Sequence, residues 1–266
     1  MPTQRLITLT TDFGGSDYFV GAMKGVILTI NPDVRMVDIT HGIQSYDVLD
    51  GALTIAHAAA CYPADTIHLV VVDPGVGSSR RPILAEIDKQ YFVAPDNGVL
   101  SLLYEKAERT QVRHITATHY FRQPVSNTFH GRDVLGPVAA WMTKGVEPAK
   151  FGEAVSDYVR FTTPKPKLVD GNTIKGIVLK TDKFGNLVTN LRAEDIPQLF
   201  AEPTPPFRIV VNNCEITELR TSYANAPEGK VFAILGSMGY LELSANRRPA
   251  SQLAGAGKGV ELTLTL

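Results

Sequence analysis

The stretch Leu6–Thr11, which reads LITLTT and is followed at once by Asp12, sets the fold of the first half of the chain. It is a short apolar run bounded by polar and glycine residues. Val34–Ile39 (VRMVDI) and Thr66–Val72 (TIHLVVV) are two further runs of this kind. Runs of this length and composition are typical of buried strands in a parallel sheet.

Helical periodicity fills the gaps between these three strands. Asp17 is expected to cap a helix that reaches about Ile30, and Asp47 to cap another that continues through Ala60. Alternating strands and helices predict an α/β layered domain with right-handed crossovers and a mainly parallel sheet. Strands at Arg81–Ile87, Tyr91–Ala94 and Val112–Ile115, and a helix at Arg132–Lys144, complete it.

A polar stretch with two prolines separates this domain from the rest of the chain. Pro164 and Pro166 lie in a Thr-Pro-Lys-Pro sequence that suits an extended connector. We therefore expect an N-terminal α/β domain at residues 1–165 and a smaller C-terminal all-β domain, a barrel or sandwich, at residues 166–266. Its β-branched segments are Gly176–Thr181, Arg208–Val211, Val231–Leu235, Tyr240–Leu243 and Val260–Leu266.

Composition and charge exclude several classes of function. The 266 residues carry 26 basic and 27 acidic side chains, a net charge of -1, which lacks the basic excess of a nucleic-acid binder. No apolar run approaches the roughly 20 residues of a membrane span, and the first residues do not resemble a signal peptide. We expect a cytoplasmic protein without membrane or nucleic-acid partners. Cys61 and Cys214 are expected to be reduced structural thiols.

Two candidate sites lie just beyond predicted strands, where open α/β sheets bind ligands. Asp12, in Thr-Asp-Phe-Gly-Gly-Ser-Asp, could accept hydrogen bonds from a ribose diol, or could simply end the strand. Asp73 and Arg80, in Asp-Pro-Gly-Val-Gly-Ser-Ser-Arg-Arg, could orient a water molecule, or could belong to a surface loop. This second stretch fits neither a P-loop nor a dinucleotide-binding pattern.

A third candidate is His130, in Thr-Phe-His-Gly-Arg-Asp, near the amino end of the last predicted helix. The helix dipole disfavours an imidazolium there and favours a neutral ring that can take a proton. The alternative is a capping or packing histidine. A fourth is Phe184 with Asn186, which could bind a nucleobase, although Phe-Gly-Asn is also ordinary hairpin chemistry. Residues 236–240 and 246–247 could likewise be a turn and a solvated edge.

Five motifs, TDFG, DPGVGSSRR, APDNGVL, TFHGRD and DKFGNLVTN, occur in this order over nearly the whole chain. In combination they resemble the S-adenosylmethionine hydroxide adenosyltransferases, also called S-adenosylmethionine hydrolases, whose superfamily includes fluorinases and chlorinases. The resemblance implies that Asp73, Arg80 and His130 surround an attacking water. In the halogenases the Asp73 position is typically Tyr, so this chain carries the water-using set.

The resemblance also implies a set of substrate-binding residues. Asp12 would hold the ribose hydroxyls and Tyr46 would cover the ribose, while Asp17, Asp182 and Ser237 would face the methionine end. The Tyr46 position is Trp in fluorinases, and Met238 replaces an Arg there. The remaining implied contacts are Gly131 beside the reacting centre and Phe184, Asn186, Asn246 and Arg247 around adenine.

The implied activity is hydrolysis of S-adenosylmethionine to adenosine and methionine by in-line attack on the ribose C5′. No metal or cofactor is expected, because a sulfonium is already an activated leaving group. The resemblance further implies a homotrimer with substrate sites at subunit interfaces. A halogenase of the same fold and a non-enzymatic sensor of adenosine or S-adenosylmethionine are the alternative functions.

Overall fold

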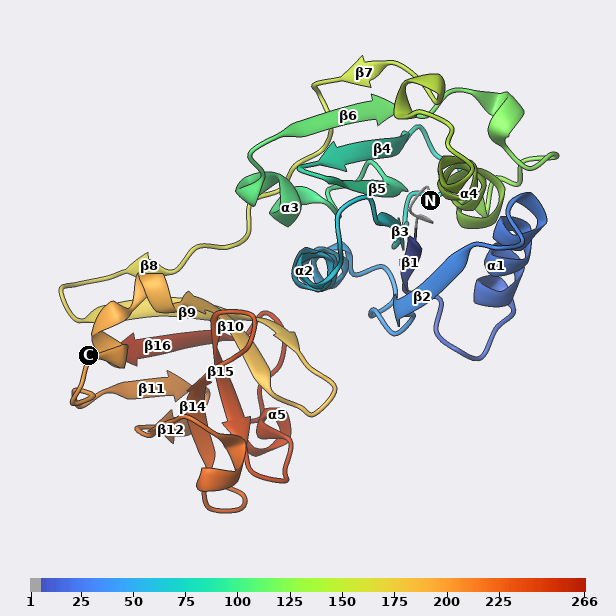
Figure 1. Cartoon of the computed structure of the whole chain (residues 1–266). Coiled ribbons are helices and arrows are strands. Elements are labelled where there is room, and N and C mark those ends of the chain that lie inside the picture. Colours follow the sequence, from blue (N-terminus) through green and yellow to red (C-terminus); the bar gives the residue numbers. More distant parts are fainter. Residues whose placement is uncertain (1–5) are drawn as a thin grey trace. The chain divides into compact units, whose positions relative to one another are not determined.

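The computed structural model describes residues 6–266, which form two compact units that divide between Thr162 and Thr163 (Figure 1). We call residues 6–162 the first unit and residues 163–266 the second unit. Within the described residues no helix is long and apolar enough to cross a bilayer. Both cysteines are free.

The first unit is built on a sheet with strand order β2-β1-β3-β5-β4-β6-β7. Neighbours from β2 to β5 pair in parallel, whereas β4 runs antiparallel to both β5 and β6, so β6 shares the common direction. The predicted α/β fold with mostly parallel strands is confirmed. The strands are β1 (Leu6–Thr11), β2 (Arg35–Thr40), β3 (Ile67–Val71), β4 (Pro82–Ile87), β5 (Gln90–Pro95), β6 (Thr110–His114) and β7 (Ala154–Val155).

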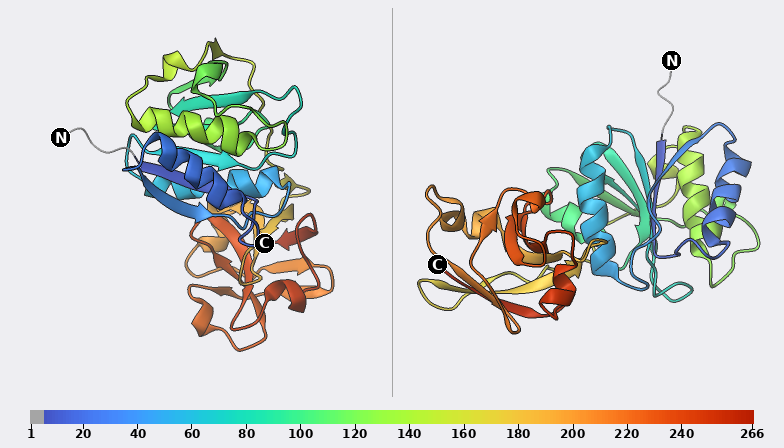
Figure 2. Two further views of the ribbon diagram at one scale, coloured as in Figure 1. Left: turned by 90° about the vertical axis from the view of Figure 1, so that its right-hand side faces the viewer. Right: turned by 90° about the horizontal axis from the view of Figure 1, so that it is seen from below.

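Helices cover both faces of this sheet (Figure 2). α1 (Phe19–Ile30) and α4 (Gly136–Thr143) lie on one face, and α2 (Val48–Ala58) and α3 (Ser101–Lys106) lie on the other. The central strand β3 serves both layers, because its side chains alternate. Leu69 packs with the α1 and α4 layer, whereas Val70 packs with the α2 and α3 layer.

Two local predictions for the first unit were wrong. β2 was expected to be buried but is a partly exposed edge strand, because only β1 pairs with it. Asp17 does not cap α1: the residue before the helix is Tyr18, without a side-chain cap. The helix expected at Arg132–Lys144 is present, with a first turn over Gly131–Leu135 that is π-helical and leads into α4.

Asp47, by contrast, caps α2 as predicted. Its side chain accepts a hydrogen bond from the Asp50 backbone nitrogen at 2.9 Å. His68 is fully buried in β3 and stacks on Phe92. Burial lowers the pKa of His68 to about 4. It therefore remains neutral in the core at physiological pH.

The second unit is one curled, mostly antiparallel sheet with strand order β12-β11-β16-β9-β10-β15-β14-β13, and β8 pairs with β9. Only β13 and β14 pair in parallel. The predicted all-β character is confirmed. The chain path is β8 (Lys167–Leu168), β9 (Thr173–Thr181), β10 (Leu187–Arg192), β11 (Arg208–Val211), β12 (Cys214–Ile216), β13 (Leu219–Arg220), β14 (Val231–Leu235), β15 (Tyr240–Ala245), α5 (Ala250–Leu253) and β16 (Glu261–Thr265).

Candidate active site

Two aspartates meet at the carboxyl edge of the first unit's sheet. Asp12 follows β1 directly, and Asp73 follows β3 by two residues. The strands are neighbours in register, with Thr11 paired to Val71. Parallel strands that end together place their loops side by side, which is why strand-end residues of separate segments can share one site.

Asp73 forms a bidentate ion pair with Arg80 across a short glycine-containing loop. Arg80 Nε donates to Asp73 Oδ1 at 2.9 Å, and Arg80 Nη2 donates to Asp73 Oδ2. The side chains are only 5% and 9% exposed. Such two-point pairing fixes the plane of both groups, because the guanidinium fork matches the carboxylate geometry.

The same guanidinium reaches His130, which lies 50 residues further along the chain. Arg80 Nη2 donates to His130 Nδ1 at 3.2 Å. Because arginine has only donors, Nδ1 must accept, so the neutral ring carries its proton on Nε2. Burial and then the Arg80 charge hold the pKa of His130 below its usual value. This direction agrees with the neutral ring expected from the sequence, and burial is its largest cause.

One glycine joins the two loops that carry these groups. Gly77 has a φ of 76°, and a Cβ there would overlap the backbone carbonyl oxygen of Asn127. Only glycine allows both this conformation and this contact without strain. The Asp73–Arg80 loop therefore packs directly against the segment that leads into His130.

A cavity of about 430 Å³ opens in front of this constellation. Arg80 is not part of its lining, and its Nη1 is buried without a hydrogen-bond partner among the described residues. Arg80 thus contacts Asp73 and His130 without lining the cavity itself. The predicted site residues that line the cavity are Asp12, Asp17, Tyr46, Asp73, His130 and Gly131.

Asp12 and Tyr46 form the outer part of this cavity. Asp12 Oδ2 accepts a hydrogen bond from the Tyr46 backbone nitrogen at 2.9 Å. Burial raises the pKa of Asp12, against the lowering effect of that hydrogen bond. Tyr46 is 74% exposed, has a positive φ of 68° and lines the cavity. A carboxylate with one oxygen committed to the backbone retains acceptor capacity for a ligand.

Three phenylalanines, which the sequence analysis did not single out, form an aromatic wall of the cavity. The rings of Phe13, Phe19 and Phe129 lie 5.4 to 5.8 Å apart, centroid to centroid. Gly131 is buried beside them, and a Cβ on it would lie 3.1 Å from Val71 Cγ1. The wall makes one side of the cavity apolar, which limits the space open to water.

The second unit has its own cavity of about 820 Å³. Asn246 does not line it, because its side-chain nitrogen donates to the Ala226 carbonyl oxygen at 2.8 Å. The other candidates of this unit do line it, namely Asp182, Phe184, Asn186, Ser237, Met238 and Arg247.

The Asp182 carboxylate accepts hydrogen bonds within its own hairpin turn. Its Oδ1 accepts from the backbone nitrogens of Phe184 and Asn186, and its Oδ2 accepts from the Asn186 side-chain nitrogen, each at 2.8 Å. The hairpin chemistry that the sequence analysis left open is therefore present. The same turn leaves the Phe184 ring 78% exposed, as a flat apolar surface beside the cavity.

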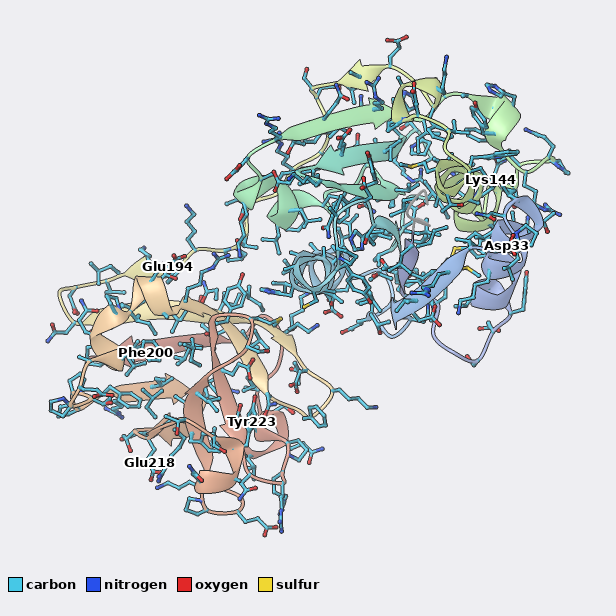
Figure 3. The ribbon with its side chains drawn as sticks, in the orientation of Figure 1. Asp33, Lys144, Glu194, Phe200, Glu218 and Tyr223 are labelled. Carbon is cyan, nitrogen blue, oxygen red and sulfur yellow. The ribbon has the colours of Figure 1, made fainter. Side chains whose placement is uncertain are left out.

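Two lining residues of the second cavity were not predicted from the sequence. The Tyr223 hydroxyl donates to Glu242 Oε2 at 3.2 Å, and Tyr223 lies on the second unit (Figure 3). Glu242 is the one acidic residue in the otherwise uncharged strand β15. A lone charge in an otherwise uncharged strand was the signal that could have identified it.

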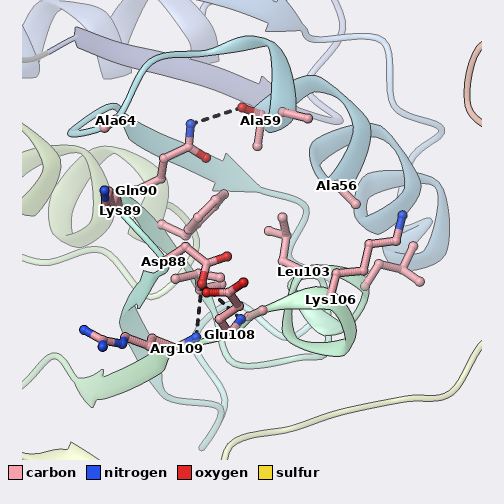
Figure 4. Close-up of a pocket in the computed structure, with 15 residues that line it drawn as sticks. Ala56, Ala59, Ala64, Asp88, Lys89, Gln90, Leu103, Lys106, Glu108 and Arg109 are labelled. Atoms are coloured by element: carbon pink, nitrogen blue, oxygen red, sulfur yellow. Dashed lines mark hydrogen bonds between the residues drawn. The ribbon is translucent and has the colours of Figure 1, made fainter.

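A further cavity of about 690 Å³ lies elsewhere on the first unit, between α2, α3 and the β4–β5 turn (Figure 4). The turn residue Asp88 is committed to the Glu108 and Arg109 backbone nitrogens, and Gln90 donates to the Ala59 carbonyl oxygen. None of the predicted site residues lies there. Among residues 6–266, no three His, Cys, Asp or Glu side chains gather as metal ligands would.

Comparison with known proteins gives two family matches and several relatives. Models of the N-terminal and C-terminal domains of SAM hydroxide adenosyltransferase match residues 7–152 and 176–263. A protein of Salinispora tropica named (R)-S-adenosyl-L-methionine hydrolase is 35% identical, with 97% of each chain covered. A protein of Methanocaldococcus jannaschii with the same name is 31% identical, over 93% of this chain and 91% of its own length.

A more distant relative and a solved structure also match nearly the whole chain. A fluorinase of Actinoplanes sp. is 25% identical, with 98% of this chain and 97% of its own length covered. The crystal structure of an uncharacterized conserved protein from Thermotoga maritima superimposes with a TM-score of 0.91 at 32% identity, covering 98% of this chain and 100% of that one. With both domain models matched in order over most of its length, the chain belongs to the SAM hydroxide adenosyltransferase family.

Proposed function

We propose that this protein hydrolyses S-adenosylmethionine to adenosine and methionine. The observation that carries the proposal is that Asp73 and His130 line one cavity with Asp12 while Arg80 fixes both from behind. The side chains proposed to bind the water and the side chain proposed to bind the ribose thus line the same cavity. The names of the relatives from S. tropica and M. jannaschii support this assignment.

The nucleophilic water lies between Asp73 and His130 in this proposal. Ionised Asp73 can only accept hydrogen bonds, and the Nε2–H of neutral His130 can only donate. A water that donates to Asp73 and accepts from His130 keeps one lone pair free for attack. Arg80 is a positioning residue, because it contacts these two side chains and does not line the cavity.

The bond changes follow from this placement. The water oxygen forms a bond to the ribose C5′ as the bond from C5′ to the sulfonium sulfur breaks, and that electron pair stays on sulfur. The water proton passes to Asp73 and then to solvent, since His130 already carries its single proton on Nε2. The products are adenosine, neutral methionine thioether and a proton. Holding the water in line with the leaving sulfur is the main contribution of the protein.

Neither a metal nor a cofactor is required in this scheme. The leaving group departs without charge, so it needs no Lewis acid and no proton donor. The apolar wall of Phe13, Phe19 and Phe129 restricts competing water around the reacting centre.

For the rest of the substrate we assign the contacts by position. Asp12 accepts from the ribose hydroxyls and Tyr46 covers the sugar, because both line the first-unit cavity. Phe184 stacks on adenine, as its exposed ring allows, and Ser237 lies at the methionine end of the second-unit cavity.

We also propose a homotrimer in which each substrate is shared by two subunits. Light scattering would give the mass of the assembly. Mixing inactive Asp73→Asn chains with Phe184→Ala chains, whose KM is raised, should increase the activity at low substrate concentration after mild dissociation and reassembly, because some sites then combine two intact halves. A mixture that gains nothing over the separate variants contradicts shared sites.

The deciding experiment is incubation with each sulfonium epimer of S-adenosylmethionine, followed by chromatographic identification of products. We expect equimolar adenosine and methionine, from the (R) epimer named for the relatives. Parallel reactions with fluoride, chloride or bromide separate a halogenase, which would yield a 5′-halo-deoxyadenosine. Tight binding without any product would indicate a sensor and overturn the proposal.

A further inference from the structure

We propose that Asn97, together with Asp96 beside it, is a positioning residue of the active site, which holds the loop of the Asp73–Arg80 ion pair at both ends. The inference rests on the proposed function. It gives a role to Ala-Pro-Asp-Asn-Gly-Val-Leu, the one motif of the five from which the proposed reaction takes no residue. Asn97 is not part of the cavity lining that the described residues form, so it acts through Asp73.

The direction of the Asp73 side chain depends on the residues at the end of β3. Val70 packs with the α2 and α3 layer, whereas Val71 packs with the α1 and α4 layer and lines the cavity. Val72 lies against Gly51 of α2, where a Cβ on the glycine would be 3.2 Å from Val72 Cγ2. The alternation of the strand therefore continues through Val72, and it returns Asp73 to the face of the sheet that holds the cavity.

Asn97 holds the peptide that joins Val72 to Asp73. Its side-chain nitrogen donates to the Val72 carbonyl oxygen at 2.8 Å. Because a peptide unit is planar, a carbonyl oxygen held in this way also fixes the backbone nitrogen and the Cα of the next residue, which is Asp73. The neighbouring strand β5 ends at Pro95, which has no backbone N–H to donate. Beyond that point the Asn97 side chain supplies a donor to the residue that follows β3.

The Asn97 side chain is itself fixed at both ends of its amide. Its Oδ1 accepts from the Val99 backbone nitrogen at 3.1 Å, which closes a turn over residues 97–99. Gly98, with a φ of 92°, allows the backbone to reverse there. Only the amide nitrogen can donate to Val72, and only the amide oxygen can accept from Val99. A carboxylate in place of this amide would keep the turn but could not donate to Val72.

Asp96 holds the other end of the same loop. Its Oδ2 accepts from Arg81 Nε at 3.0 Å and from Arg81 Nη2 at 2.7 Å, and its backbone nitrogen donates to the Arg81 carbonyl oxygen at 2.8 Å. Arg81 directly follows Arg80, the partner of Asp73. Two consecutive residues of one turn thus fix the chain just before Asp73 and just after Arg80. A bidentate ion pair requires this, because its two parallel hydrogen bonds tolerate little displacement of either side chain.

The first test compares Asn97→Asp with Asn212→Asp in the full chain. Each substitution keeps the size of the side chain and one acceptor oxygen, and removes an amide that donates to a backbone carbonyl oxygen at 2.8 Å. The acceptor is Val72 for Asn97 and Gly255, in the second unit, for Asn212. Asn97→Asp should lower kcat for S-adenosylmethionine about tenfold or more, since a misplacement of about 1 Å can cost about 10²-fold.

The KM for S-adenosylmethionine and the Kd of adenosine should change less than about twofold in Asn97→Asp, because Asp12 and the second unit are untouched. Asn212→Asp should leave kcat, KM and the adenosine Kd within about twofold of the unaltered protein. An Asn97→Asp kcat equal to that of Asn212→Asp overturns the proposal. So does a weakening of adenosine binding as large as the loss of kcat, because Asn97 would then support the fold as a whole.

The second test requires no turnover and uses hydrogen–deuterium exchange of the substrate-free protein. In Asn97→Asp the backbone amides of residues 73–80 should exchange about fivefold faster, in line with one lost hydrogen bond, while those of α1 and β1 keep their rates. Unchanged exchange in residues 73–80 overturns the proposal even if the protein hydrolyses S-adenosylmethionine. Faster exchange there in a protein without hydrolysis would support the positioning role and contradict only the proposed function.

A second pair of variants guards against misfolding of Asn97→Asp. Asp96 and Asp157 both pair with Arg81, but their side chains are 3% and 76% exposed. Asp96→Asn keeps an oxygen for the Val159 backbone nitrogen and weakens the buried pair, so kcat should fall about fivefold at an unchanged KM. Asp157→Asn should keep kcat within about twofold. Equal kcat values for Asp96→Asn and Asp157→Asn would show that this turn does not hold the loop and would overturn the assignment.

Discussion

The first-unit cavity with Asp73 and the second-unit cavity with Glu242 each contain a buried carboxylate, but different donors hold the two carboxyl groups. In the first unit Asp73 is neutralised by a bidentate arginine that also holds a histidine. In the second unit the Glu242 carboxyl accepts a hydrogen bond from the Tyr223 hydroxyl. The first arrangement is complete before substrate arrives, as a reacting centre must be. The second holds its carboxyl through a neutral donor, as a binding site can.

This difference predicts that changes at Asp73 and His130 lower kcat, whereas changes in the second unit raise KM. The largest effect is expected for Asp73→Asn, which removes the acceptor for water and leaves Arg80 buried without a counter-charge. Turnover should fall about 10²-fold or more, the scale of a positioned acid–base group. Product chromatography under substrate saturation measures it.

The neighbouring arginine supplies a matched control for that variant. Arg81 pairs with Asp157, whose side chain is 76% exposed and lies outside the cavity. Asp157→Asn removes the same charge from an exposed Asp–Arg pair and should leave turnover within about twofold, since exposed ion pairs contribute little. Equal losses in the two variants would mean that Asp73 acts through stability and not through chemistry.

The next effect concerns pH and tests the state of His130. Its pKa lies below the usual 6.5, so the ring is neutral at pH 7 and above. Protonation adds a hydrogen to Nδ1 and destroys the acceptor for Arg80. We expect kcat/KM to stay flat above pH 7 and to fall about tenfold per pH unit below the His130 pKa. The neutral form favoured by folding also makes acidification destabilise the protein as pH falls below 6.5.

Variants can assign this acid limb. His130→Asn should lack it, whereas a substitution of the exposed His119, which lies outside the cavity, should retain it. A pH profile of kcat/KM from pH 4.5 to 9 for the three proteins decides the question. An unchanged acid limb in His130→Asn would assign the titration to another group.

A smaller effect is expected for Asp12, which binds and does not react. Asp12→Ala removes an acceptor for the ribose hydroxyls and should raise the Kd of adenosine about tenfold. Asp12→Asn keeps an oxygen for the Tyr46 backbone nitrogen and should lose less affinity. Isothermal calorimetry with adenosine alone separates this loss from catalysis, and wild-type affinity in both variants would remove Asp12 from the site.

The smallest effect is expected in the second unit at Phe184. Phe184→Ala removes an exposed aromatic surface and should raise KM about fivefold with kcat within about twofold, in line with one stacking contact. Leu168→Ala, which removes an exposed apolar side chain away from that cavity, is the control. A kcat loss comparable to that of Asp73→Asn would erase the functional difference between the two units.

Much of this site could be predicted because it depends on local patterns. Asp12 and Asp73 follow apolar strands, and the alternation of strands and helices already places such positions at one edge of a sheet. The Asp47 cap could be predicted for the same reason, since it depends on four consecutive residues, 47–50. The family resemblance added roles to positions that the pattern had already identified.

What the sequence did not predict depends on side-chain geometry across distant segments. The contact from Arg80 to His130 fixes the tautomer of the ring, but it requires two loops to meet in three dimensions. Asp17 has the right residue type for a cap, yet the helix begins after Tyr18. Glu242 was overlooked because strand periodicity alone does not distinguish a solvated face from a cavity.

The close packing of Gly77 against Asn127 has an evolutionary consequence. The loop with Asp73 and Arg80 packs at Gly77 against the backbone oxygen of Asn127, which leads into His130. A change in the path of one segment would therefore displace the other. We therefore expect a change in the path of one segment to require a matching change in the other. A chimera that imports only one of them from a distant relative should misplace its nucleophile, whereas one that imports the pair together should keep its geometry.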